Sequence, residues 1–281
     1  MFLFSSNLYI GLISFLFVLP MFRSGVMVQR LIHPITPKLV TISPGGYRGY
    51  YLLGVTSYIR QKFNTDQCFF SGASAGAWLS LMMTYRGNHT TLIEDMGLFS
   101  PGFTNQNLKQ IQEKISDILL EKYTTEDFDL NRLYVGVSRL SKFYVETDVY
   151  SNFRDLEDAV RCCQASSHIP FITGGMLRLY DRRLTFDGGF SVYPYLNETE
   201  PILHICTEIW SDDKDKREKW NRMNPLVKNI RILLEQTSLF SKNKMNMLDL
   251  YWKGYHDSAK NHLYLAGLFP ELDLTRGEKG L

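Results

Sequence analysis

The sequence predicts an α/β fold in which a mostly parallel sheet is flanked by helices. Short apolar runs of strand type alternate with longer segments whose apolar residues recur at helical spacing. Glycine-rich turns separate several of these segments, and a strand, turn and helix in this order are typical of parallel sheets with crossover helices. The length of 281 residues is compatible with one such domain.

The first part of the pattern runs strand, helix, strand, helix. Residues 37–43 form an apolar strand that leads into a Pro-Gly-Gly turn, and residues 50–63 have helical spacing. A buried strand is expected over residues 67–71. After the turn Gly-Ala-Ser-Ala-Gly, a helix continues over residues 77–85.

The later elements are less regular in length. Helical spacing returns in residues 105–123 and 153–165. From Lys219 onward two helices are expected, the second near residues 243–265. Further strands are expected over residues 133–137, 143–145, 184–186 and 202–209.

The composition is that of a globular protein, with 44% hydrophobic and 21% charged residues. The 31 Lys and Arg residues nearly balance the 29 Asp and Glu residues, so we expect no nucleic-acid partner. The cysteines are too few for a disulfide scaffold and lack C-x-x-C spacing, so we expect no metal site. They are Cys68, Cys162, Cys163 and Cys206.

The N-terminus is apolar and then basic. Residues 1–22 carry no charge, and the strictly apolar run 8–22 is shorter than the roughly 18 residues that a spanning helix needs. Basic residues follow, and the first acid is Asp66. This pattern favours attachment to an anionic membrane surface. The alternatives are a single pass through residues 8–22, a cleaved signal with a lumenal or secreted product, and a leader that precedes initiation at Met21 or Met27.

The segment Gly72-Ala73-Ser74-Ala75-Gly76 is a G-x-S-x-G motif between a predicted strand and a predicted helix. In that context the motif is typical of a nucleophile elbow, a sharp turn that exposes the serine hydroxyl above the sheet. The positive end of the following helix favours negative charge that develops there. Ser74 is therefore the candidate nucleophile.

Two other glycine motifs follow predicted strands. In Gly45-Gly46-Tyr47-Arg48-Gly49, unshielded backbone N–H groups are suited to bind an anion such as a tetrahedral oxyanion. The phosphate-binding patterns G-x-x-x-x-G-K-[ST] and G-x-G-x-x-G are both missing from this segment. In Asp187-Gly188-Gly189, a carboxylate stands at a strand end, which by itself is also typical of an ordinary turn.

Taken together and in this order, the three motifs resemble those of the patatin-like lipid acyl hydrolases. The stretch Ala165-Ser166-Ser167-His168-Ile169-Pro170-Phe171 also resembles a segment of that family, and the resemblance covers residues 39–192. It implies a three-layer catalytic domain over residues 35–210. An N-terminal anchor-like or signal-like segment and basic linker would occupy residues 1–34, and a helical extension packed on the same domain residues 211–281.

The resemblance implies a Ser–Asp dyad without a cofactor. Ser74 would be the nucleophile and Asp187 the general base. Gly45, Gly46, Tyr47, Arg48 and Gly49 would form the oxyanion loop, and Gly72, Gly76, Gly188 and Gly189 would support the motifs. Pro44 departs from the family pattern, because proline has no N–H to offer where many members have glycine. The implied partners are a membrane or lipid-droplet surface and a phospholipid or acylglycerol substrate.

Two other hypotheses remain open. An ordinary α/β-hydrolase esterase would need a histidine after Ser74, and His256 has the best position among His168, His204, His256 and His262. A protein of the same fold that binds lipid without turnover is the second alternative. The intact Ser74, Asp187 and loop glycines favour an enzyme.

Overall fold

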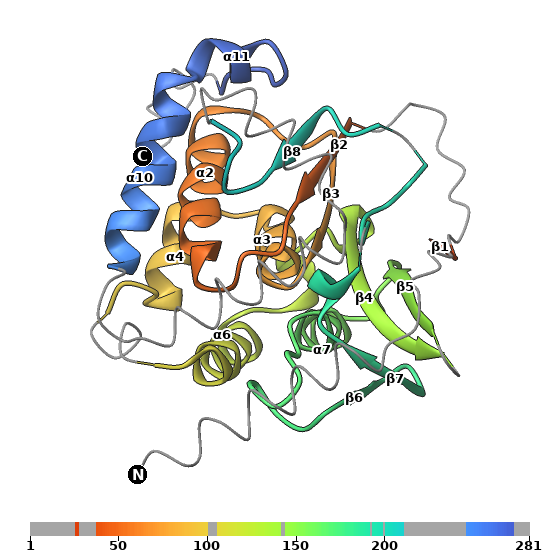
Figure 1. Cartoon of the computed structure of the whole chain (residues 1–281). Coiled ribbons are helices and arrows are strands. Elements are labelled where there is room, and N and C mark those ends of the chain that lie inside the picture. The colour runs from red at the N-terminus through yellow and green to blue at the C-terminus, as the bar shows by residue number, and fades with distance from the viewer. Residues whose placement is uncertain are drawn as a thin grey trace.

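The computed structural model confirms the α/β class, with a mostly parallel central sheet flanked by helices (Figure 1). Neighbouring strands follow the order β1-β5-β4-β3-β2-β8. The pairs β1–β5, β4–β3, β3–β2 and β2–β8 are parallel, whereas β4–β5 is antiparallel. The structure describes residues 26–27, 38–100, 106–141, 144–191, 193–198, 200–210 and 246–272.

The strands of this path differ widely in length. The central strands coincide with short apolar runs in the sequence. A hairpin of β6 and β7 lies off the main path, and β7 pairs with β4. The strands are β1 (Val26–Met27), β2 (Lys38–Ile42), β3 (Cys68–Ala73), β4 (Leu133–Ser141), β5 (Tyr144–Tyr150), β6 (Arg178–Tyr180), β7 (Arg183–Phe186) and β8 (Leu203–Ile205).

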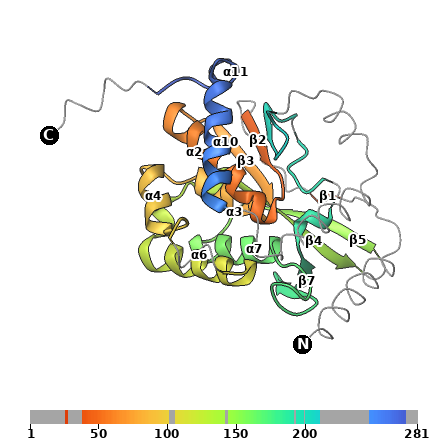
Figure 2. The ribbon, with the colours of Figure 1, turned by 60° about the vertical axis from the view of Figure 1, so that its left-hand side comes forward.

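Helices α3 (Ala75–Met83) and α7 (Leu156–Ser166) pack on the strands, and α2 (Gly49–Lys62) packs on α3. Helix α10 (Met247–Lys260) lies against α2, and Figure 2 shows it in front of that helix. The remaining α-helices of the described chain are α4 (His89–Met96), α6 (Leu108–Lys122) and α11 (His262–Ala266). Because α2 is enclosed by α3, α4 and α10, it is buried on all sides.

The two faces of the sheet have different cores. Val40, Phe70 and Val135 belong to the main core, which the helices share. The alternate residues point to the opposite face, where Leu39 and Tyr134 pack with Leu196. That face is covered there by the segment 193–198, whose Leu196 N–H donates to the Ser71 hydroxyl at 2.9 Å.

Helices α2 and α10 approach closely because each has a glycine at the crossing. A Cβ atom added to Gly54 would lie 2.0 Å from the carbonyl oxygen of Tyr251. A Cβ atom added to Gly254 would lie 2.0 Å from that of Tyr51. Ala at either position would therefore force the two backbones apart.

Most expected elements are present within a few residues, and the differences are local. The sequence did not predict α4, β1 or β6; β5 is longer than expected and β8 is shorter. The helix expected just after Lys219 lies outside the described residues, as does the apolar run 8–22. In the described part of the chain, no helix combines the length and apolar character needed to cross a bilayer. The expected domain boundaries remain a prediction.

We expect Gly254→Ala to lower the free energy of unfolding by about 2 kcal/mol, because the clash with α2 outweighs the helix propensity gained. Urea unfolding measures the difference. The matched control is Gly175→Ala, since no atom lies within 4 Å of the added Cβ there. A gain in stability for Gly254→Ala would show that the helix crossing tolerates a methyl group.

Candidate active site

Two strand ends meet on the same edge of β4. Strand β3 runs parallel to β4 and its last pair is Ala73 with Gly136. Strand β7 runs antiparallel to β4 and ends with Phe186 opposite Ser138. Continuing each register by one residue brings both Ser74 and Asp187 to the level of Val137. The sheet therefore brings together two residues that are 113 positions apart in the sequence.

The Ser74 hydroxyl donates a hydrogen bond to Asp187 Oδ2 at 2.7 Å. Ser74 has φ 55° and ψ −125°, a backbone conformation that is rare for residues other than glycine. Helix α3 begins at the next residue, so its N-terminus faces the hydroxyl. Both side chains are buried, with exposed fractions of 4% each.

The motif glycines allow these close approaches. A Cβ atom on Gly76 would lie 2.1 Å from the carbonyl oxygen of Ile42, so α3 could not start beside the end of β2. A Cβ atom on Gly188 would lie 2.3 Å from the carbonyl oxygen of Gly136. Gly72 faces the backbone of Gly76, and Gly189 faces Pro44 and the Asp187 carboxylate.

Burial changes the acidity of the Asp187 carboxyl. Desolvation raises its pKa from the ordinary value of 3.8 to about 7. The hydrogen bonds from the Ser74 hydroxyl and the Gly189 N–H, the latter at 2.6 Å to Oδ1, act in the opposite direction. A carboxylate with such a pKa is a much stronger base than an exposed aspartate.

Ser166, at the end of α7, connects the backbone of the elbow at Ser74 to strand β4. Its hydroxyl accepts the Ser74 N–H at 2.8 Å and donates to the Gly136 carbonyl at 2.6 Å. Ser167 accepts the indole N–H of Trp78 in α3 at 2.9 Å. The sequence placed both serines in a family-like stretch but did not assign them these partners.

The expected oxyanion loop lies beside the elbow, since a Cβ atom on Gly49 would meet the Ala75 methyl at 2.9 Å. The Arg48 N–H donates to the Gly45 carbonyl at 2.8 Å, and the Gly49 N–H donates to carbonyls of the same turn. Among the described residues, the backbone hydrogen bonds formed outside helices and strands include none donated by the N–H groups of Gly45, Gly46 or Tyr47. These three N–H groups are therefore the candidate donors for an anion.

The histidines take other positions. His256 lies on the exposed side of α10, where its ring stacks on Trp252. His168 touches Asp187 through its backbone: its carbonyl accepts the Asp187 N–H at 2.8 Å, while its ring Nε2 lies 3.0 Å from the Gly175 oxygen. The part of the chain that the structure describes has no group of three His, Cys, Asp or Glu residues suited to a metal ion.

We expect Ser166→Ala to lower the free energy of unfolding by about 2–4 kcal/mol, because it leaves a buried N–H and a buried carbonyl unpaired. Ser80→Ala is the matched control. Ser80 is equally buried, but its hydroxyl has no hydrogen-bond partner in the described structure. Chemical denaturation compares the two. Equal losses would show that the Ser166 hydrogen bonds do not hold the elbow.

We expect Asp187→Asn to become more stable than the native chain as the pH rises. Because the folded-state pKa is raised, native stability is complete at pH values below the unfolded pKa of about 4 and decreases as the pH rises through about 7. Asparagine does not titrate. Urea unfolding should therefore favour the variant by about 2–3 kcal/mol more at about pH 8 than at about pH 5. A difference that does not change with pH would contradict the raised pKa.

No protein-family model matches the chain, and no curated protein matches it. Among solved structures, the chain is similar to VipD from Legionella pneumophila, whose crystal structure is known. The two are 14% identical, and the similarity covers 84% of this chain and 68% of VipD, with a TM-score of 0.39.

Proposed function

We propose that the protein is a serine lipid acyl hydrolase that cleaves fatty-acyl esters through a Ser–Asp dyad and an acyl-enzyme intermediate. The observation that carries the proposal is the 2.7 Å hydrogen bond from the Ser74 hydroxyl to the buried carboxylate of Asp187. It occurs at a strand-to-helix elbow, which is where hydrolases of this type hold their nucleophile.

In the acylation step, the Ser74 oxygen attacks the ester carbonyl carbon while Asp187 accepts the hydroxyl proton. The tetrahedral intermediate then collapses. The bond to the leaving alcohol breaks, the proton passes from Asp187 to that alcohol, and the acyl group stays on Ser74. In deacylation, Asp187 takes a proton from water, and the water oxygen attacks the acyl carbonyl carbon. The ester bond to Ser74 then breaks, the proton passes from Asp187 to the Ser74 oxygen, and a free fatty acid leaves.

The negative charge that develops on the carbonyl oxygen needs fixed donors. The N–H groups of Gly45 and Gly46 are the proposed ones, with the Tyr47 N–H as a third. The N-terminus of α3 adds a favourable field. An aspartate removes a proton from a hydroxyl poorly, so both this stabilisation and the raised pKa of Asp187 contribute to the rate.

The substrate class follows from the motif resemblance to patatin-like lipid acyl hydrolases. Phospholipid is the leading substrate and acylglycerol the second, taken from a membrane or lipid-droplet surface. The His-dependent esterase is less favoured, because His256 stacks on Trp252 on α10, whereas the hydrogen-bond partner of Ser74 is Asp187. A lipid-binding protein without turnover remains the alternative that the experiment below addresses.

We expect the protein to release free fatty acid from phospholipid vesicles, and Ser74→Ala and Asp187→Asn to lower kcat at least about a thousandfold. His256→Ala, the control, should keep its activity. Because Asp187 must be ionised to act as a base, kcat/KM should fall as the pH drops below about 7. Quantified product release over a pH series gives all of these results.

A fluorophosphonate probe gives a second measurement that does not depend on the lipid. It should label the native chain and not Ser74→Ala. Activity retained in Asp187→Asn would contradict the dyad. Absence of both labelling and turnover in the native chain would instead favour the lipid-binding protein.

A further inference from the structure

His168 is a buried histidine that the proposed mechanism does not use. It follows the end of α7 by two residues and lies in the loop that leads to β6. Its ring Nε2 lies 3.0 Å from the carbonyl oxygen of Gly175. Because a carbonyl oxygen only accepts hydrogen bonds, Nε2 carries the hydrogen and donates it. Burial lowers the pKa of the ring, so the ring is neutral near pH 7.

The backbone of His168 holds Asp187 at the point where β7 leaves the sheet. The last pair of β7 with β4 is Phe186 with Ser138. At the next residue, the Asp187 N–H donates to the His168 carbonyl at 2.8 Å. Among the turn and loop hydrogen bonds of the described residues, this is the one that joins the Asp187 backbone to a distant segment. The position of the His168 carbonyl therefore sets where the Asp187 backbone lies.

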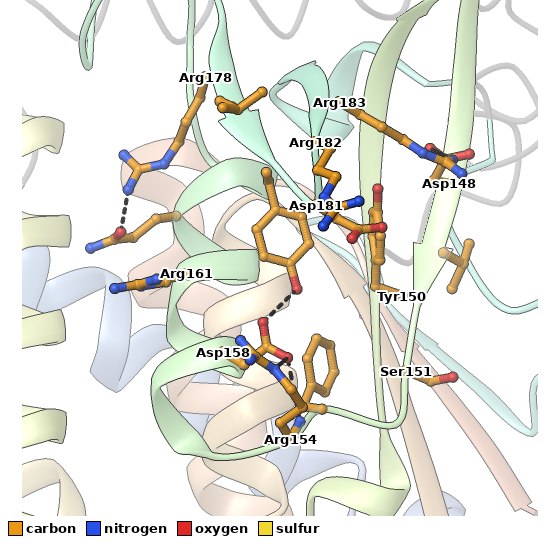
Figure 3. A pocket seen from close by; sticks show the side chains of 15 residues that line it. Asp148, Tyr150, Ser151, Arg154, Asp158, Arg161, Arg178, Asp181, Arg182 and Arg183 are labelled. Atoms are coloured by element: carbon orange, nitrogen blue, oxygen red, sulfur yellow. Dashed lines mark hydrogen bonds and ion pairs between the residues drawn. The ribbon is translucent and has the colours of Figure 1, made fainter.

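The loop after α7 folds back so that Gly175 reaches the His168 ring. The Phe171 N–H donates to the same Gly175 carbonyl at 3.2 Å. The far end of the loop is attached to α7, since Arg178 donates to the side-chain oxygen of Gln164 at 2.5 Å, and Figure 3 draws this bond as a dashed line. Both ends of the loop are thus tied to α7. The Gly175 carbonyl therefore has a fixed position from which to hold the ring.

Apolar packing holds the same segment against the residues around Asp187. Ile169 belongs to one buried cluster with Phe186 and Phe190, which precede and follow Asp187 in the sequence. The two phenylalanine rings pack edge to face, with their centroids 5.5 Å apart. The backbone at positions 168–169 and the backbone around Asp187 therefore form one packed unit, and the ring of His168 anchors this unit to the loop.

A small displacement of the Asp187 backbone affects both oxygens of its carboxylate. Oδ2 accepts from the Ser74 hydroxyl at 2.7 Å, and Oδ1 accepts from the Gly189 N–H at 2.6 Å. A shift of about 1 Å would lengthen the first of these beyond hydrogen-bond range. Because proton transfer requires that contact, such a shift would slow the removal of the Ser74 proton.

We propose that His168 is a positioning residue, whose ring, through its hydrogen bond to Gly175, holds the His168 carbonyl and thereby keeps the Asp187 carboxylate at the Ser74 hydroxyl. The ring itself transfers no proton and contacts neither member of the dyad through its nitrogen atoms. The effect on rate rests on the proposed hydrolase function, whereas the placement of Asp187 is measurable without turnover.

The first test compares two substitutions in the full chain, with a water-soluble short-chain ester as substrate. His168→Leu removes the donor at similar volume, and kcat should fall at least about tenfold with little change in KM. His168→Gln places an amide N–H near the position of Nε2 and should restore most of the native kcat. In both variants the Gly175 carbonyl keeps the Phe171 N–H as its partner. Native kcat in His168→Leu, or equal losses in the two variants, would overturn the proposal.

A second pair of variants moves the ring without replacing it. A Cβ atom on Gly174 would lie 2.8 Å from the ring carbon Cε1 of His168, whereas one on Gly175 would have no atom within 4 Å. Gly174→Ala should therefore lower kcat, and Gly175→Ala should keep it. These variants provide the comparison if His168→Leu fails to fold. Equal kcat in the two would count against the proposal.

The titration of the Asp187 carboxyl reports its placement without turnover. The hydrogen bonds from Ser74 and Gly189 lower its pKa against the effect of burial, so losing them while the carboxyl stays buried should raise the pKa further. Carbon-13 NMR of the aspartate carboxyls, with Asp187→Asn to assign the signal, follows this change.

The midpoint of this titration should move to higher pH in His168→Leu and stay at the native value in His168→Gln. An unchanged midpoint in His168→Leu would overturn the proposal. If the native chain hydrolyses no ester, the proposed function fails, and the titration still decides whether His168 positions Asp187.

Discussion

The candidate site depends on one strand, β4, because the ends of two other strands, β3 and β7, pair with the same edge of it. Its first residues pair with β3 and its later residues with β7, so that Ser74 and Asp187 reach the same level from opposite directions. This arrangement needs a glycine at position 136, because Ser166, Gly188 and Pro194 all lie close to its backbone. A shift of β7 by one residue would turn the Asp187 carboxylate to the other face of the sheet.

The sequence was sufficient where the determinants are local. A G-x-S-x-G motif between an apolar strand and a helix identifies the elbow, because only small flanking residues permit the approach of Gly76 to Ile42. The β–α–β order likewise follows from periodicity, and β2, α2 and β3 lie within a few residues of their predicted limits. The pairing of Ser74 with Asp187 came from the order of the motifs and their family resemblance. Nothing in the spacing of the two residues required it.

The remainder depends on contacts between distant segments. The role of Ser166 requires the end of α7 to lie behind the elbow, which no local pattern reveals. Strand β5 extends beyond its predicted end through the polar residues Thr147 and Asp148, and Asp148 is buried where it pairs with Arg139 and Arg183. Helix α4 was missed although Asn88 caps its start and Gly97 ends it in a left-handed conformation, two signals that were available.

The crossing of α2 and α10 has a consequence for biosynthesis. Helix α2 directly follows the glycine-rich segment 45–49, and its outer face is covered by residues that lie almost 200 positions later, as in the pair Gln61 and Tyr255, which are 194 apart. A ribosome therefore completes α2 long before it supplies the helix that covers it. The nascent chain meanwhile exposes the apolar side of α2 to the solvent and to chaperones. Closing such a long loop late makes this contact a slow step in folding.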